Sequence, residues 1–95
     1  MAQATILASA QTAGTSTDVV VAAGSNASVG LFCTGALPAG SRLATLKMDT
    51  PGDDLPIAEL SAAYPVHVIS GPGTYRVVRE NIAHKGVNVG VFSES

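Results

Sequence analysis

The segment VHVISGPGTYRVVR, residues 66–79, constrains the fold more than any other part of the chain. Two extended runs, Val66–Ser70 and Thr74–Arg79, flank the sequence Gly-Pro-Gly at 71–73. This is a strong turn signal, because proline presets φ and glycine accepts the positive φ that turns often need. Tyr75 follows the turn closely. A tyrosine there is typical of the corner in immunoglobulin-like sandwiches, where its hydroxyl bonds to nearby backbone. The segment therefore predicts a hairpin within a small all-β sandwich.

Apolar and polar residues alternate with a period of two along most of the chain, which indicates strands. The expected strands are Ala4–Ser9, Thr15–Ala22, Ala27–Thr34, Arg42–Asp49, Leu55–Tyr64, Val66–Ser70, Thr74–Arg79 and Val87–Val91. The sequence Gly-Ser-Asn at 24–26 resembles a hairpin connection. Strand-sized runs at this spacing predict one antiparallel β-sandwich over residues 1–95, immunoglobulin-like or jelly-roll-like, with about seven or eight strands.

Residues 55–64 allow a second interpretation. Ile57, Leu60 and Tyr64 have helical spacing, and Asp54 followed by a proline could open a helix. Pro65 would stop such a helix early, and the neighbouring segments favour strands. We expect a strand here, with one or two helical turns as the alternative.

The alternation also predicts which side chains face the core. The expected inward residues are Val19, Val21, Val29, Leu31, Leu46, Val68, Tyr75, Val77, Val89 and Val91. Cys33 continues the inward face of its strand, so we expect a buried, inert thiol. Arg76 is expected on the opposite face from Tyr75 and Val77.

Composition excludes several classes of protein. The net charge is −2 and the five basic residues are dispersed, whereas a nucleic-acid-binding protein concentrates lysine and arginine on one face. No apolar run approaches the roughly 18 residues of a membrane span. The N-terminal sequence MAQATILASAQ lacks the basic and apolar regions of a signal peptide, so we expect synthesis in the cytoplasm.

No pattern in the sequence indicates a cofactor, a metal or catalysis. Asp49, Asp53 and Asp54 gather in one turn, but their spacing does not match a calcium loop, so we expect solvated turn carboxylates. His67 and His84 with one cysteine are too few ligands for a zinc site. No nucleophile is placed beside a base in a recognisable motif.

The first 41 residues contain a single charged side chain, Asp18. Natural β proteins usually protect exposed edges with charges, so an uncharged half can pair with a neighbouring subunit. The alternative is that serine and threonine side chains solvate this surface adequately. The first expected strand is apolar and uncharged. The candidate protein-interface residues are therefore Ala4, Thr5, Ile6, Leu7, Ala8 and Ser9.

Five segments carry a resemblance to a known class of proteins. They are DVVVAAGSNASVGLF (18–32), LPAGSRL (37–43), TPGDD (50–54), VISGPGTYRVVR (68–79) and GVNVGVFSES (86–95). Together they resemble small virion proteins of tailed bacteriophages, in particular the capsid decoration or cement class. The resemblance implies a compact β domain that caps the outer shell, often as a trimer, and binds through a surface rather than a motif.

These observations lead us to expect a non-enzymatic virion protein that binds the major capsid protein or other virion proteins on the outer head surface. We also expect a homo-oligomer, with a trimer favoured. The alternative is a tail, connector or fibre-associated β module that recognises a receptor or a carbohydrate. Sugar sites usually use exposed aromatic rings, and the chain has only four aromatic residues, of which Tyr75 is expected in the core.

Overall fold

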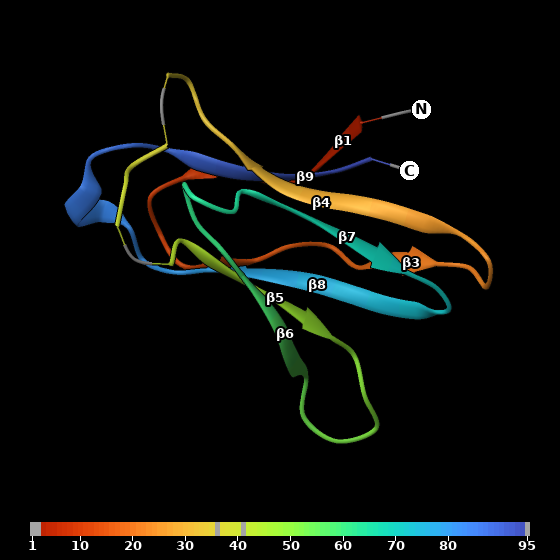
Figure 1. Ribbon diagram of the computed structural model, residues 1–95. Coiled ribbons are helices and arrows are strands. Elements are labelled where there is room, and N and C mark those ends of the chain that lie inside the picture. Colours follow the sequence, from red (N-terminus) through yellow and green to blue (C-terminus); the bar gives the residue numbers. More distant parts are fainter. Residues whose placement is uncertain (1–2, 36, 41, 95) are drawn as a thin grey trace.

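The computed structural model describes residues 3–35, 37–40 and 42–94 (Figure 1). Its elements are β1 (Gln3–Ala10), β2 (Gly14–Thr15), β3 (Val19–Val21), β4 (Asn26–Phe32), β5 (Ala44–Met48), β6 (Leu55–Leu60), β7 (Val66–Ser70), β8 (Gly73–Arg79), the 3-10 helix η1 (Ala83–Lys85) and β9 (Val89–Glu94). Sheet A has the order β1-β9-β4-β7, and sheet B has the order β2-β8-β5-β6 with β3 also paired to β8. All pairings are antiparallel. The expected all-β, sandwich-like fold is confirmed.

The core lies between the two sheets and is mostly aliphatic, because alternate residues of each strand point inward. Its buried members are Val21, Ala27, Val29, Leu31, Leu43, Ala44, Leu46, Leu60, Ile69, Tyr75, Val77, Ile82, Val89 and Val91. Val19 is half-buried against this cluster. The inward assignment of Val68 is wrong, because Val68 is 60% exposed and its neighbour Ile69 is 3% exposed. Ile69 pairs with the buried Ala27, and this register places Val68 outside.

The expected strand Thr15–Ala22 is two strands, β2 and β3, so the described residues contain nine strands. Ser16 causes the interruption: its Oγ accepts the Val77 amide at 2.9 Å, in the place of a backbone carbonyl. The next amide, that of Thr17, donates to the Ile6 carbonyl of β1 at 3.0 Å. The chain thus reaches across to sheet A before it returns to sheet B as β3.

The expected hairpin at Val66–Arg79 is also wrong, because β7 lies in sheet A and β8 in sheet B. Both sides of β8 are already occupied, by β5 on one side and by β2 and β3 on the other, so β7 pairs with β4. The Tyr75 hydroxyl donates to the Ser70 carbonyl at 2.8 Å across this corner. The tyrosine corner is therefore present between two sheets rather than within one.

The connection at residues 24–26 likewise passes between sheets, from β3 to β4, and is not a hairpin. Residues 55–60 form a strand, as expected, and β6 pairs with β5. After Leu60 the chain turns, with the Ser61 amide on the Tyr64 carbonyl at 3.3 Å. Cys33 is half-buried rather than buried, and its Sγ contacts the Gly35 carbonyl at 3.5 Å. It follows β4, where the chain leaves the sheet.

Arg79 closes one end of the core and is only 3% exposed. It continues the inward face of Tyr75 and Val77 on β8, and its burial lowers the pKa of the guanidinium from its ordinary value. Its Nε donates to the Thr12 carbonyl at 2.7 Å, and its Nη1 donates to the carbonyls of Ala8 at 2.8 Å and Val89 at 2.9 Å. Arg79 thus ties β8 to two adjacent strands of sheet A, the edge strand β1 and its neighbour β9.

Candidate protein-interaction surface

Charge is segregated between the two sheets. The four strands of sheet A contain one acidic residue, Glu94, and no lysine or arginine. The strands of sheet B contain Lys47, Glu59, Arg76 and Arg79, and further charged residues flank them. One face of the sandwich is therefore nearly uncharged, and it is formed by strands from both halves of the chain.

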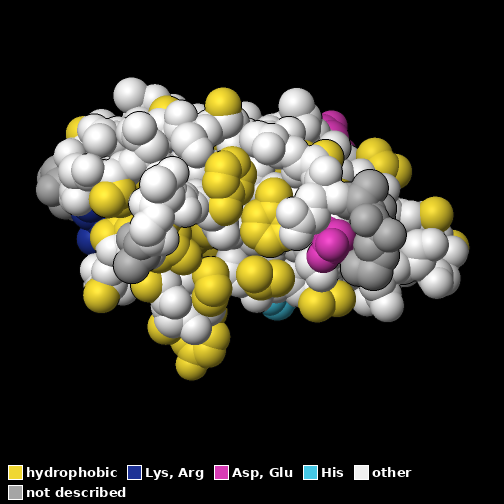
Figure 2. All heavy atoms as spheres, turned by 90° about the horizontal axis from the view of Figure 1, so that it is seen from above, with side chains coloured by type: hydrophobic (Ala, Val, Ile, Leu, Met, Phe, Trp, Pro, Cys, Tyr) yellow, Lys and Arg dark blue, Asp and Glu magenta, His cyan; other side chains and the backbone are white. Residues whose placement is uncertain are grey.

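The register of sheet A shows which side chains form its outer face, because directly paired residues point the same way. One row across the four strands consists of Thr5, Phe92, Gly30 and Val66. The adjacent row consists of Gln3, Glu94, Ser28 and Val68. Figure 2 looks onto this side of the molecule and shows hydrophobic side chains gathered across the middle, with few charged side chains in view.

Both phenylalanines of the chain lie on this outer face instead of in the core. Their ring centroids are 6.4 Å apart with a tilt of 54° between the planes. A Cβ at Gly30 would be 2.7 Å from the Phe92 ring, and a Cβ at Gly90 would meet the Phe32 ring. Each ring therefore packs against a glycine of the neighbouring strand, in space that a side chain at that position would fill.

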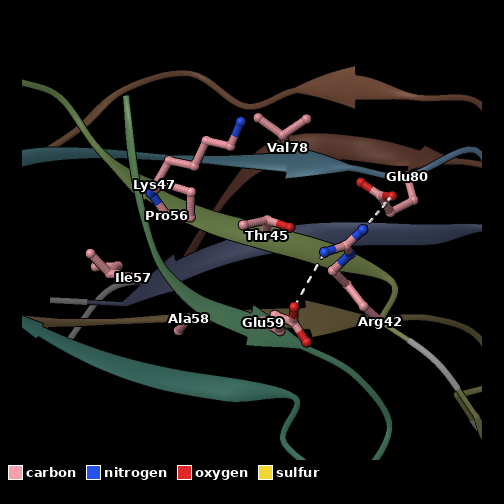
Figure 3. A pocket seen from close by; sticks show the side chains of 9 residues that line it. All are labelled: Arg42, Thr45, Lys47, Pro56, Ile57, Ala58, Glu59, Val78 and Glu80. Carbon is pink, nitrogen blue, oxygen red and sulfur yellow. Dashed lines mark hydrogen bonds and ion pairs between the residues drawn. The ribbon is translucent and has the colours of Figure 1, made fainter. Parts of the chain in front are cut away.

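The outer face of sheet B is different in character. Arg42 lies between two carboxylates, with its Nη1 3.2 Å from Glu59 and its Nη2 3.3 Å from Glu80 (Figure 3). Lys47 and Thr45 line the same shallow pocket. All three side chains are exposed, so these ion pairs belong to a solvated, charged surface and add little stability.

Arg76 gathers carboxylates from two separate segments. Its Nε is 3.0 Å from Asp18, its Nη1 is 2.7 Å from Asp54, and Asp49 lies 3.7 Å away. The hydrogen bond to Asp18, followed by the bond to Asp54, raises the pKa of Arg76 above its ordinary value. The expectation of a fully solvated turn is therefore wrong for Asp54, which is half-buried against Arg76. Asp53 is exposed, as expected.

The interface residues expected from the sequence lie on β1, at one edge of sheet A: Ala4, Thr5, Ile6, Leu7, Ala8 and Ser9. The structure divides them by role. Ile6 and Leu7 pack partly against the core. Thr5 is exposed on the outer face, opposite Phe92. Thr5 therefore belongs to the uncharged face, whereas Ile6 and Leu7 also hold the fold together.

Within the described residues, no group of three or more His, Cys, Asp and Glu side chains is placed to hold a metal ion. His67 is exposed on β7, and the His84 side chain lies outside the described part of the structure. None of the described helices is long and apolar enough to cross a membrane.

Two parts of the surface were not foreseen from the sequence. The uncharged character of the N-terminal half is visible in the sequence, but β7 and β9 complete the face from the C-terminal half. The outward position of Phe32 and Phe92 follows from strand phase, since both residues alternate with buried neighbours. Comparison of the chain with protein-family models, with curated proteins and with solved structures finds no match.

Proposed function

We propose that the protein is a non-enzymatic virion structural protein of a tailed bacteriophage, and that it decorates the outer surface of the capsid. Sheet A faces the shell and contacts the major capsid protein, and sheet B faces solvent. The segregation of charge carries this proposal, together with the resemblance of the sequence to phage virion proteins. Desolvating a charge is costly, so an uncharged face is the one that docks at least cost.

The size of the face fits a repeated contact. Four strands about 4.8 Å apart, with five to eight residues each, form a face only about 20 Å on a side. The area of such a face is about 400 Å², which is smaller than the roughly 800 Å² that each partner buries in a stable complex. A single copy therefore binds weakly. Many copies on a symmetric lattice still stabilise the shell, because each binds only the assembled state. The resemblance favours trimers around local symmetry axes.

The test is the copy number of the protein in purified virions, measured by quantitative mass spectrometry against the major capsid protein. Decoration of the shell predicts a copy number that scales with the capsid lattice, in the hundreds. A copy number of six or twelve would contradict shell decoration and would indicate a tail or connector component. Absence from purified virions would contradict a structural role altogether.

One observation favours a second candidate, a fibre- or tail-associated module that binds a carbohydrate. Phe32 and Phe92 form a shallow hollow together with Gln3, Ala4 and Thr5. Aromatic rings beside polar groups are the usual components of a sugar site. Titration with host-surface glycans, read by shifts in the NMR signals of the two rings, tests this candidate. Saturable shifts in the wild type that are lost in Phe92→Ala would support it.

A further inference from the structure

Each of the two sheets has two edges. Proteins normally protect such edges from pairing with strands of other chains. The edge at β1 is protected by the chain itself. Its register with β9 shifts twice, which bends the strand. The Ile6 carbonyl accepts a hydrogen bond from the Thr17 amide, and the Ala8 carbonyl accepts one from the Arg79 guanidinium. Part of the backbone of β1 is therefore already bonded.

The two edges of sheet B are protected as well. Strand β6 contains Pro56 and Glu59, and its pairing with β5 has a register shift. Strands β2 and β3 are only two and three residues long, and Asp18 precedes β3. In contrast, β7 pairs with β4 in one continuous register over all five residues. It contains no proline and no acidic residue, lysine or arginine.

Two hydrogen bonds at the ends of β7 determine which of its backbone groups face β4. The Leu31 amide donates to the Pro65 carbonyl at 2.9 Å, and the Gly71 amide donates to the Ser25 carbonyl at 2.9 Å. Both pairs lie on the same register as β4 and β7. Because bonded and non-bonded pairs alternate in an antiparallel ladder, the odd-numbered residues of β7 bond to β4.

The backbone groups of Val66, Val68 and Ser70 therefore point to the open edge. The Ser70 carbonyl is taken by the Tyr75 hydroxyl at 2.8 Å. The N–H and C=O groups of Val66 and Val68 are left facing outward on an exposed strand, and both valine side chains are exposed on the outer face of sheet A. This edge can accept another strand.

We propose that β7 pairs with β7 of a second copy of this chain, antiparallel and around a two-fold axis at His67. In this register Val66 bonds to Val68 of the second copy and Val68 bonds to Val66, which uses the outward N–H and C=O groups of both valines on both strands. A register centred on Val68 is worse, because it would pair Val66 with Ser70, whose carbonyl is occupied.

A second copy fits this edge because the edge is self-complementary. It contains no acidic residue, lysine or arginine that would repel its own copy, and the exposed valines of the two copies become cross-strand neighbours. The two sheets A then form one eight-stranded sheet with a continuous, nearly uncharged outer face. A two-fold contact joins copies in pairs, so a trimer would need a different surface. The pairing does not depend on where the protein acts.

A strand of five residues is about 17 Å long, so the contact buries far less than a stable interface and the free dimer is weak. Disulfide trapping detects a weak dimer. The two copies of residue 67 would face each other as a non-bonded pair with Cα atoms about 4.5 Å apart, within disulfide range. The variant is His67→Cys in a Cys33→Ser background. The matched control is Val20→Cys in the same background, because Val20 is 76% exposed on another edge strand.

Mild oxidation of concentrated protein should convert H67C to a disulfide-linked dimer and leave V20C largely monomeric. Adding Val68→Pro should abolish the H67C dimer, since proline removes an outward N–H without disturbing the bonds to β4. Adding Val68→Lys should also abolish the H67C dimer, because it places positive charges at the contact between the two β7 strands. Equal dimer yields for H67C and V20C would overturn the proposal, as would an H67C yield that both Val68 variants leave unchanged. Virion binding has no part in this assay, so its result is separate from the proposed capsid role.

Discussion

Replacing Arg79 by methionine tests how much the hydrogen bonds of its guanidinium stabilise the contact between the two sheets. Methionine has a similar length but no donor, so the carbonyls of Ala8, Thr12 and Val89 would each lose a charged hydrogen-bond partner. Such bonds are worth about 1.5–3 kcal/mol each, and the sum is offset because a guanidinium need no longer be buried. We expect Arg79→Met to lower the free energy of unfolding by about 3–5 kcal/mol. A domain of 95 residues has only about 5–14 kcal/mol in total.

The assay is urea denaturation followed by far-UV circular dichroism. Arg42→Met is the matched control, because Arg42 makes two ion pairs but its side chain is 44% exposed. Exposed pairs contribute at most about 1 kcal/mol, so this variant should unfold close to the wild type. Similar losses for the two variants would refute the reasoning, since they would mean that Arg79 does not hold β1 and β9 to β8.

Two further substitutions test the corner between the sheets by the same denaturation assay. Gly71→Ala should destabilise the fold by about 3 kcal/mol or more, because its Cβ would overlap the Ala22 carbonyl, whereas Gly52→Ala has open space around it and should be nearly neutral. If the two alanine variants are equally stable, β7 and β8 do not approach β3 as described. Tyr75→Phe should cost about 1 kcal/mol by removing the bond to the Ser70 carbonyl. A neutral Tyr75→Phe would show that the hydroxyl bond does not stabilise the corner.

The inward faces of most strands could be predicted from the sequence, because alternation is a local property. Strands β4, β5, β8 and β9 each have one apolar phase, and the structure buries it. In β7 both phases are apolar: Val66 and Val68 on one, Ile69 on the other. Only the pairing with β4 decides between them, and it buries Ile69.

Strand pairing could not be predicted, because it depends on contacts between distant segments. A Gly-Pro-Gly turn predicts a reversal of the chain, but a reversal within a sheet and a corner between sheets have the same local signal.

The burial of Arg79 also could not be predicted from local sequence alone. The phase of Tyr75 and Val77 places it inward, but its burial depends on carbonyls near residues 8, 12 and 89.

The candidate surface was predictable only in part, for the same reason. The charge-poor half of the chain identifies β1 and β4 as members of an uncharged surface. The strands that complete it, β7 and β9, come from a half of the sequence that contains most of the charges. Apart from Glu94, those charges lie on sheet B, in the connections or in η1, which no linear pattern reveals.

The most direct test of the proposed role compares one lysine on each face of the sandwich. Thr5 is exposed on the outer face of sheet A, and Thr15 is exposed on sheet B, where it pairs with Val78. Neither lies at the β7 edge, so both variants keep the proposed strand pairing. Binding of Thr5→Lys and Thr15→Lys to capsids that lack the protein is measured by co-sedimentation.

Burying a lysine against the shell costs at least about 1.4 kcal/mol, a factor of about ten in affinity. Docking through sheet A therefore predicts that Thr5→Lys binds at least about tenfold more weakly than the wild type, while Thr15→Lys binds as the wild type does. Wild-type binding by Thr5→Lys together with loss of binding by Thr15→Lys would contradict the assignment of the docking face. No binding of the wild-type protein to these capsids would contradict the decoration role itself.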